Sequence, residues 1–237
     1  EKIKKLITNK TKAIIINSPH NPTGSVLTEN QVKKIYEIAE EFDLVLISDE
    51  VYGRMIFSDS PSGFHSPSKY DKCLKRTILV HSLSKTYAMT GWRIGAVTGP
   101  EKLIEKMSLL YETITSCTAP FIQHAAIEAM INSNEKTYEM LSQYQARRDL
   151  IVNGLNNING ISCLKPEGTF YAFANIKKLG ILSEKFSLDL LHNGYVASCP
   201  GIFFGSNGEG FVRFCFANSL ENIEIGLDRI NKYINTL

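Results

Sequence analysis

Short apolar runs alternate with amphipathic stretches through the first part of the sequence, and this alternation restricts the fold more than any other feature. The runs at residues 13–16, 44–47 and 77–80 have the length and composition of strands. After the first run, Thr28 and Gln31 form a capping box ahead of apolar residues at helical spacing. Strands that alternate with helices are typical of a mostly parallel sheet with crossover helices. The first part is therefore predicted to be an α/β domain.

Each of these three predicted strands ends in polar residues. Prolines and turn formers at residues 17–24 prevent the first strand or a helix from continuing. Acidic residues follow the second strand, and a Ser- and Lys-containing turn follows the third. Open parallel sheets bind ligands beyond the carboxyl ends of their strands. We therefore expect one pocket to gather Asn21, Asp49, Tyr52, Ser82 and Lys85.

The remainder of the sequence predicts a second, smaller domain. The first domain is predicted to end with a fourth extended run at 93–98 and two helical patterns. A long helix from Asn134 to about Asn157 then leads into the second domain. Beyond that helix, short strands mix with two helices, the second of which has Ser219 as its cap. The predicted strands lie at 161–164, 170–174, 195–198 and 211–216. We expect a large domain at residues 1–133 and a small α+β domain at 134–237, entered by the long helix.

Composition excludes several classes of protein. The 26 basic and 24 acidic side chains leave a net charge of +2, so no overall field favours nucleic acid or an anionic membrane. Apolar runs are too short to span a membrane and no leader opens the sequence, which predicts a cytoplasmic protein. Histidine spacing indicates no metal site. The cysteines are scattered and odd in number, as expected of reduced thiols: Cys73, Cys117, Cys163, Cys199 and Cys215.

The strongest chemical signal lies at residues 81–95. A lysine just after a strand in a Ser/Thr-rich turn is similar to a phosphate loop, but that motif needs glycine where Leu79 and Ser84 stand. The segment instead offers the amine of Lys85, the hydroxyl of Ser82 and the guanidinium of Arg93. These groups suit an aldehyde and a phosphate carried on one molecule. Pyridoxal phosphate has that combination.

This segment resembles the lysine motif of the class I aminotransferases, which are fold-type-I pyridoxal-phosphate enzymes. Three further motifs agree in order: residues 21–24 (Asn-Pro-Thr-Gly), 49–52 (Asp-Glu-Val-Tyr) and 212–214 (Val-Arg-Phe). The matches extend over almost the whole chain. The resemblance implies a three-layer α/β/α large domain that binds the cofactor, of which residues 1–133 are the C-terminal part.

The resemblance implies catalytic roles for three residues. Lys85 would hold the cofactor as a Schiff base and, once displaced by the substrate's amine, act as a general base. Asp49 would favour the protonated pyridine nitrogen, because a neighbouring opposite charge stabilises the charged form. Tyr52, together with Asn21, would hydrogen-bond the phenolic oxygen of the cofactor.

Binding roles follow from the same resemblance. Ser82 and Arg93 would hold the cofactor's phosphate, and Arg213 with Asn21 would bind the substrate's carboxylate. The implied substrates are an α-amino acid and a 2-oxo acid, and the full-length parent is expected to be a homodimer. The predicted function is transfer of an amino group between these two acids.

Two alternatives remain open. One is a lyase or decarboxylase on the same scaffold, against which Arg213 argues modestly because it anchors the carboxylate that a decarboxylase removes. The other is a truncated fragment without activity. Complete members of the family are longer, and the N-terminal portion that supplies further cofactor contacts has no counterpart in this sequence.

Other noticeable residues have simpler interpretations. Trp92 and Tyr87 are predicted to pack in the core. The glycine-rich segment 205–210 is interpreted as a flexible connection ahead of a strand. Arg147 and Arg148 are expected on the surface of the long helix.

Overall fold

The computed structural model describes residues 1–72 and 74–237, so Cys73 lies outside the described residues. The chain divides into two compact units. Unit 1 comprises Glu1–Pro19, Val26–Ile56 and Ser60–Tyr138, and unit 2 comprises His20–Ser25, Phe57–Asp59 and Glu139–Leu237. The long helix α6 (Asn134–Asn156) begins in unit 1 and continues in unit 2. Two short segments that precede it in the sequence also belong to unit 2.

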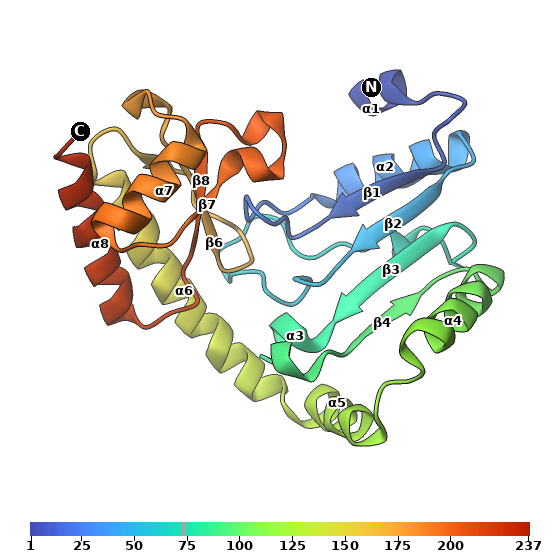
Figure 1. The fold of residues 1–237 in the computed structure, drawn as a ribbon. Helices are drawn as coiled ribbons and strands as arrows, with labels where there is room; N and C mark the ends of the chain where they lie inside the picture. Colours follow the sequence, from blue (N-terminus) through green and yellow to red (C-terminus); the bar gives the residue numbers. More distant parts are fainter. Residues whose placement is uncertain (73) are drawn as a thin grey trace. The chain divides into compact units, whose positions relative to one another are not determined.

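A four-stranded sheet forms the centre of unit 1 (Figure 1). Its strands lie in the order β1 (Ala13–Asn17), β2 (Val45–Asp49), β3 (Thr77–Ser82) and β4 (Gly95–Thr98). The first three are parallel, and β4 pairs with β3 in the antiparallel direction. The predicted mostly parallel sheet is confirmed.

The last strand of this sheet starts later than the predicted run at 93–98. Residues Thr90–Trp92 form a 3₁₀ helix, η2, and Arg93 takes a left-handed conformation with φ of 53°. Such a backbone cannot continue a strand, so β4 begins at Gly95. The prediction for Trp92 was wrong, because its side chain is 44% exposed. Tyr87 does pack against a small apolar cluster in this unit.

The helices of unit 1 differ strongly in burial. They are α1 (Lys2–Leu6), α2 (Glu29–Glu41), α3 (Leu83–Thr86), α4 (Glu101–Thr115) and α5 (Pro120–Asn132), with a 3₁₀ turn η1 (Pro67–Lys69). The capping box that opens α2 is confirmed, because Thr28 Oγ1 accepts from Gln31 N at 3.3 Å and Thr28 N donates to Gln31 Oε1 at 2.8 Å. Helix α2 packs its apolar face on the sheet, whereas α4 has no buried residue.

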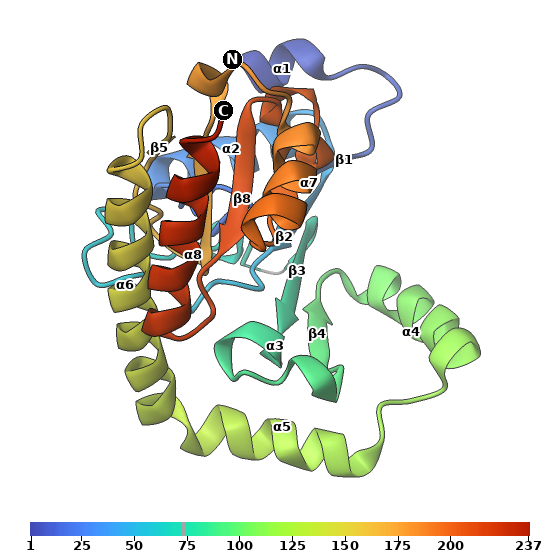
Figure 2. The ribbon, with the colours of Figure 1, turned by 60° about the vertical axis from the view of Figure 1, so that its left-hand side comes forward.

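Unit 2 is an antiparallel sheet with helices (Figure 2). Its strands lie in the order β5 (Ser162–Cys163), β6 (Tyr171–Asn175), β8 (Phe211–Cys215) and β7 (Cys199–Pro200). Its helices are α6, α7 (Ser183–Gly194) and α8 (Leu220–Ile234), with 3₁₀ turns η3 (Lys177–Leu179), η4 (Gly201–Phe204) and η5 (Ser206–Gly208). The expected α+β character and the Ser219 cap of α8 are confirmed. The strand predicted at 195–198 lies instead at β7, because Tyr195 is left-handed and ends α7.

The middle of α6 contains a buried charge that the sequence analysis placed on the surface. Arg148 is 0% exposed, and it donates to both carboxylate oxygens of Asp59 at 2.7 and 2.8 Å. Its guanidinium carbon lies 4.4 Å from the centre of the Phe57 ring, and Lys165 Nζ is 2.7 Å from Asp59. The prediction for Arg148 was wrong, because its partners come from segment 57–59, far away in the sequence.

Across residues 1–72 and 74–237, no helix is long and apolar enough to cross a membrane.

Candidate active site

Two of the predicted site residues end neighbouring parallel strands in unit 1. Asp49 is the last residue of β2 and is in register with Val80 of β3. Ser82 is the last residue of β3. Parallel neighbours end at the same edge of a sheet, so a carboxylate and a hydroxyl lie at one edge. Asp49 Oδ1 accepts a hydrogen bond from Val51 N at 3.1 Å, which orients the carboxylate in the turn that follows.

Lys85 follows this edge directly. Ser82 is the N-cap of α3, and its side chain accepts from Ser84 N at 3.1 Å. This cap starts the single helical turn that carries Lys85. Both Leu83 and Ser84 are buried, so the turn is packed against the unit rather than loose. The lysine is therefore held within one turn of the end of β3.

The backbone returns from this turn by a hairpin that carries Arg93. Ile94 O accepts from Leu83 N at 3.3 Å, and Gly95 is in register with Ser82. A Cβ atom at Gly95 would lie only 2.6 Å from His81 O, so the close approach of β4 to β3 requires glycine. Arg93 Nη1 donates to Thr90 O at 2.9 Å. The structure thus brings Ser82, Lys85 and Arg93 into one compact hairpin.

Two further residues after β2 are buried. Tyr52 and Glu50 are each 5% exposed. The carboxylate of Glu50 accepts from Ser66 Oγ at 2.6 Å and from Ser48 Oγ at 3.0 Å, and His81 Nε2 lies 3.7 Å away. The backbone N–H of Glu50 also donates to Val80 O at 2.9 Å, so this residue joins the end of β2 to β3. Sequence reasoning missed it, although side chains that alternate along a strand would have grouped it with buried Ser48 rather than with Asp49.

Replacing Glu50 by alanine is expected to lower the free energy of unfolding by about 1–3 kcal/mol, because the buried hydroxyl of Ser48 loses its acceptor. Glu50→Gln keeps an acceptor oxygen and should cost less. Urea denaturation at neutral pH measures both, with Glu105→Ala on exposed α4 as the control. Equal stability of Glu50→Ala and wild type would show that this link contributes nothing.

Unit 2 contains the other two predicted site residues, and they are in contact. Arg213 lies in the middle of β8, and its Nη1 donates to Asn21 Oδ1 at 2.8 Å. Its guanidinium carbon lies 4.2 Å from the ring centre of Tyr171 and 4.9 Å from that of Phe204. Aromatic faces attract a guanidinium, and planar stacking orients its N–H edge. Sequence reasoning missed both aromatic residues, because only the pairing of β6 with β8 and the two 3₁₀ turns before β8 bring them to Arg213.

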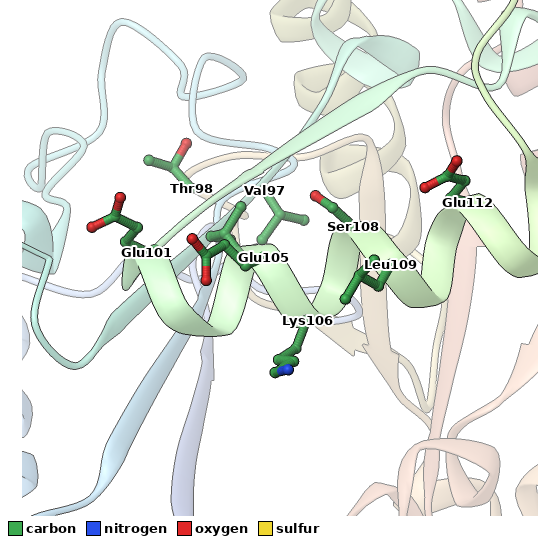
Figure 3. A pocket seen from close by; sticks show the side chains of 10 residues that line it. Val97, Thr98, Glu101, Glu105, Lys106, Ser108, Leu109 and Glu112 are labelled. Carbon is green, nitrogen blue, oxygen red and sulfur yellow. The ribbon is translucent and has the colours of Figure 1, made fainter.

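The cavity between β4 and α4 in unit 1 is a separate feature (Figure 3). It has a volume of about 680 Å³ and contains none of the predicted site residues. Glu101, Glu105, Glu112 and Lys106 are among the residues that line it. Three carboxylates and one ammonium group leave the lining with a net negative charge, which repels a phosphate group. This cavity is therefore unsuited to a phosphorylated cofactor.

Comparison with known proteins decides the family. The family model for aminotransferase class I and II matches residues 1–230. The chain belongs to the class I and II aminotransferases. Among curated members of this family, it is 42% identical over 236 residues to an aspartate aminotransferase of Pyrococcus abyssi. It is 38% identical to aromatic-amino-acid aminotransferase 2 of Thermococcus litoralis. Each alignment covers 99% of this chain and 60% of the relative.

Solved structures of class I and II aminotransferases agree with this assignment. The aromatic aminotransferase from Pyrococcus horikoshii superposes with a TM-score of 0.93 at 41% identity, over 99% of this chain and 62% of that one. The aspartate aminotransferase from Rhizobium meliloti has a TM-score of 0.90 at 32% identity, over 99% and 60%. The chain therefore has the fold of these enzymes and spans about 60% of the length of the relatives it matches.

Proposed function

We propose that the protein is an aminotransferase that uses pyridoxal phosphate to move an amino group between an α-amino acid and a 2-oxo acid. The observation that carries this proposal is the hairpin in unit 1, where Lys85 directly follows the strand edge formed by Asp49 and Ser82. Family membership supports the same reaction. Relatives named as aspartate and aromatic-amino-acid aminotransferases favour an amino acid as donor.

The residues of unit 1 fit the chemistry of the cofactor. Pyridoxal phosphate, when bound, supplies an electron sink for the electrons left when the α-proton departs. Asp49 would favour a protonated pyridine nitrogen, because its carboxylate is an opposite charge. Ser82 and Arg93 provide a hydroxyl and a planar guanidinium for phosphate oxygens. The amine, hydroxyl and guanidinium are held within one hairpin, as one ligand requires.

Lys85 has two tasks in this proposal. Its Nζ would hold the cofactor through the aldehyde carbon, with loss of water, and once displaced by the substrate's amine it would carry the proton that leaves the α-carbon. The turn that begins at Ser82 fixes the backbone position from which Nζ would act. Tyr52, which is buried, and Asn21 would donate hydrogen bonds to the phenolic oxygen of the cofactor.

Arg213 binds the substrate's α-carboxylate together with Asn21. A guanidinium forms two parallel hydrogen bonds with a carboxylate, and the amide of Asn21 is already in contact with it. An enzyme that anchors this carboxylate retains it, so transamination is favoured over decarboxylation. The lyase or decarboxylase and the inactive fragment are the alternatives.

The remaining assignments rest on the family resemblance. We assign cofactor binding to residues 1–133 and the role of small domain to residues 134–237. In its full length the protein is proposed to be a cytoplasmic homodimer that binds neither nucleic acid nor membrane.

Two measurements on the purified protein test the proposal. After incubation with pyridoxal phosphate, borohydride reduction should leave a pyridoxyl group on Lys85, located by peptide mapping. L-Aspartate alone, with no 2-oxo acid present, should then yield about one oxaloacetate per bound cofactor. A label spread over many lysines would refute the cofactor assignment. Release of CO2 in place of oxaloacetate would favour the decarboxylase.

A further inference from the structure

The segment 201–210, which joins β7 to β8 in unit 2, is compact rather than flexible. It consists of the 3₁₀ turns η4 and η5, which contact each other through two glycines. A Cβ atom at Gly201 would lie 2.0 Å from Gly208 O, and one at Gly208 would lie 2.0 Å from Gly201 O. Any larger residue would force the two turns apart. The interpretation of 205–210 as a flexible connection was therefore wrong.

A carboxylate fastens this segment to the start of α7. Glu209 Oε1 accepts from Ser183 N at 2.7 Å and from Gly210 N at 2.9 Å, and its Oε2 accepts from Ser183 Oγ at 2.9 Å. Ser183 Oγ in turn accepts from Ile202 N at 3.3 Å. The Ser183 N–H lowers the pKa of Glu209, so the carboxylate stays ionised and keeps these bonds at neutral pH. Ser183 is thus connected to both ends of the segment.

Phe204 is the residue that this compact segment brings to Arg213. Its ring centre is 4.9 Å from the guanidinium carbon, and its edge packs against Phe173 of β6 with ring centres 6.1 Å apart. Tyr171, also on β6, contacts the same guanidinium and is buried. Within the described residues, Asn21 is the only hydrogen-bond acceptor of this guanidinium. Two aromatic rings and one amide oxygen therefore contact the guanidinium.

We propose that segment 201–210 is a positioning device for Arg213, in which Glu209 and Ser183 hold the segment and Phe204 holds the guanidinium against Tyr171. The N–H edge of Arg213 is then oriented before a carboxylate arrives, so binding orders fewer degrees of freedom. The inference rests on the proposed function for the identity of the ligand, an α-carboxylate. Phe204, Ser183 and Glu209 are positioning residues, because they act through Arg213.

The test compares two neighbouring phenylalanines. Phe204→Leu removes the ring over Arg213, whereas Phe203→Leu removes a ring that is 66% exposed and serves as the matched control. Phe204→Leu should raise the KM for L-aspartate about threefold to tenfold with little change in kcat. Phe204→Tyr keeps an aromatic face and should restore the wild-type KM. Phe203→Leu should leave both constants unchanged.

A second measurement does not depend on catalysis. Relaxation of the ¹⁵Nε signal of Arg213 should show a restricted guanidinium in wild type and in Phe203→Leu, but a mobile one in Phe204→Leu. Glu209→Gln, which does not touch Arg213, should loosen the guanidinium in the same direction. This variant provides the test if Phe204→Leu fails to fold.

The two measurements separate this inference from the proposed function. Failure of wild type to form the pyridoxyl adduct on Lys85, with the guanidinium restricted as expected, would refute the proposed function and leave the positioning device intact. An Arg213 signal equally mobile in wild type and Phe204→Leu would overturn the positioning device. The same conclusion would follow if Phe203→Leu and Phe204→Leu raised KM equally.

Discussion

Lys85→Ala is expected to lower the rate of amino-group transfer by a factor of about 10⁴, the upper end of what a positioned acid–base group contributes. The variant loses both the point of covalent attachment and the amine that carries the α-proton. Neither Ser82 nor Arg93 can replace it, because a hydroxyl is a weak base and a guanidinium stays protonated. The measurement is the absorbance change of the cofactor after mixing with L-aspartate in a single turnover.

Lys85→Arg distinguishes the effect of the positive charge at this position from the effect of proton transfer by the amine. It keeps a cation at the end of the turn but cannot transfer a proton at neutral pH, so it should be as slow as Lys85→Ala. Lys102→Ala, which removes an exposed lysine from α4, is the control and should react at the wild-type rate. A Lys85→Ala protein with more than about a tenth of the wild-type rate would contradict the assignment.

Asp59→Ala is expected to lower the free energy of unfolding by about 3 kcal/mol, because it leaves the buried guanidinium of Arg148 without its bidentate partner. The neighbouring Asp149 still accepts from Arg148 at 2.9 Å, which keeps the cost near the lower end for a broken buried ion pair. Chemical denaturation of Asp59→Ala and wild type measures the difference in their free energies of unfolding. No loss of stability in Asp59→Ala would show that the buried pair is not stabilising.

Arg148→Met is the matched control for this prediction. It removes the buried charge and keeps an unbranched apolar chain of comparable length, so it should cost less than Asp59→Ala. Asp59 and Asp149, about two-fifths exposed, would remain accessible to water and to Lys165. A larger loss in Arg148→Met would show that packing on Phe57, rather than charge pairing, dominates.

The stabilisation by Asp59 should depend on pH. Hydrogen bonds from Arg148 and then Lys165 hold the pKa of Asp59 well below its ordinary value of 3.8. A carboxyl whose pKa is lower in the folded state stabilises the fold fully above the unfolded-state pKa. The difference between wild type and Asp59→Ala should therefore be complete at pH 7 and shrink as pH falls below 3.8.

Local signals in the sequence determined the elements and the order of the motifs. The capping residues Thr28 and Ser219 and the length of α6 are readable because each depends on residues a few positions apart. Parallel strands that end in polar groups follow from the same kind of pattern. The edge that carries Asp49 and Ser82 was therefore predictable without coordinates.

Tertiary structure alone decided which side chains these elements bring into contact. Arg148 is buried because Phe57 and Asp59 reach it from a segment far away in the sequence. The glycine-rich segment 201–210 is ordered because Ser183 holds it, and Phe204 thereby reaches Arg213. Periodicity in a sequence shows which face of an element is apolar, but it contains no information on which distant residue covers that face. Contacts of this kind decide whether a charge is solvated or buried, and they orient the group proposed to bind the substrate.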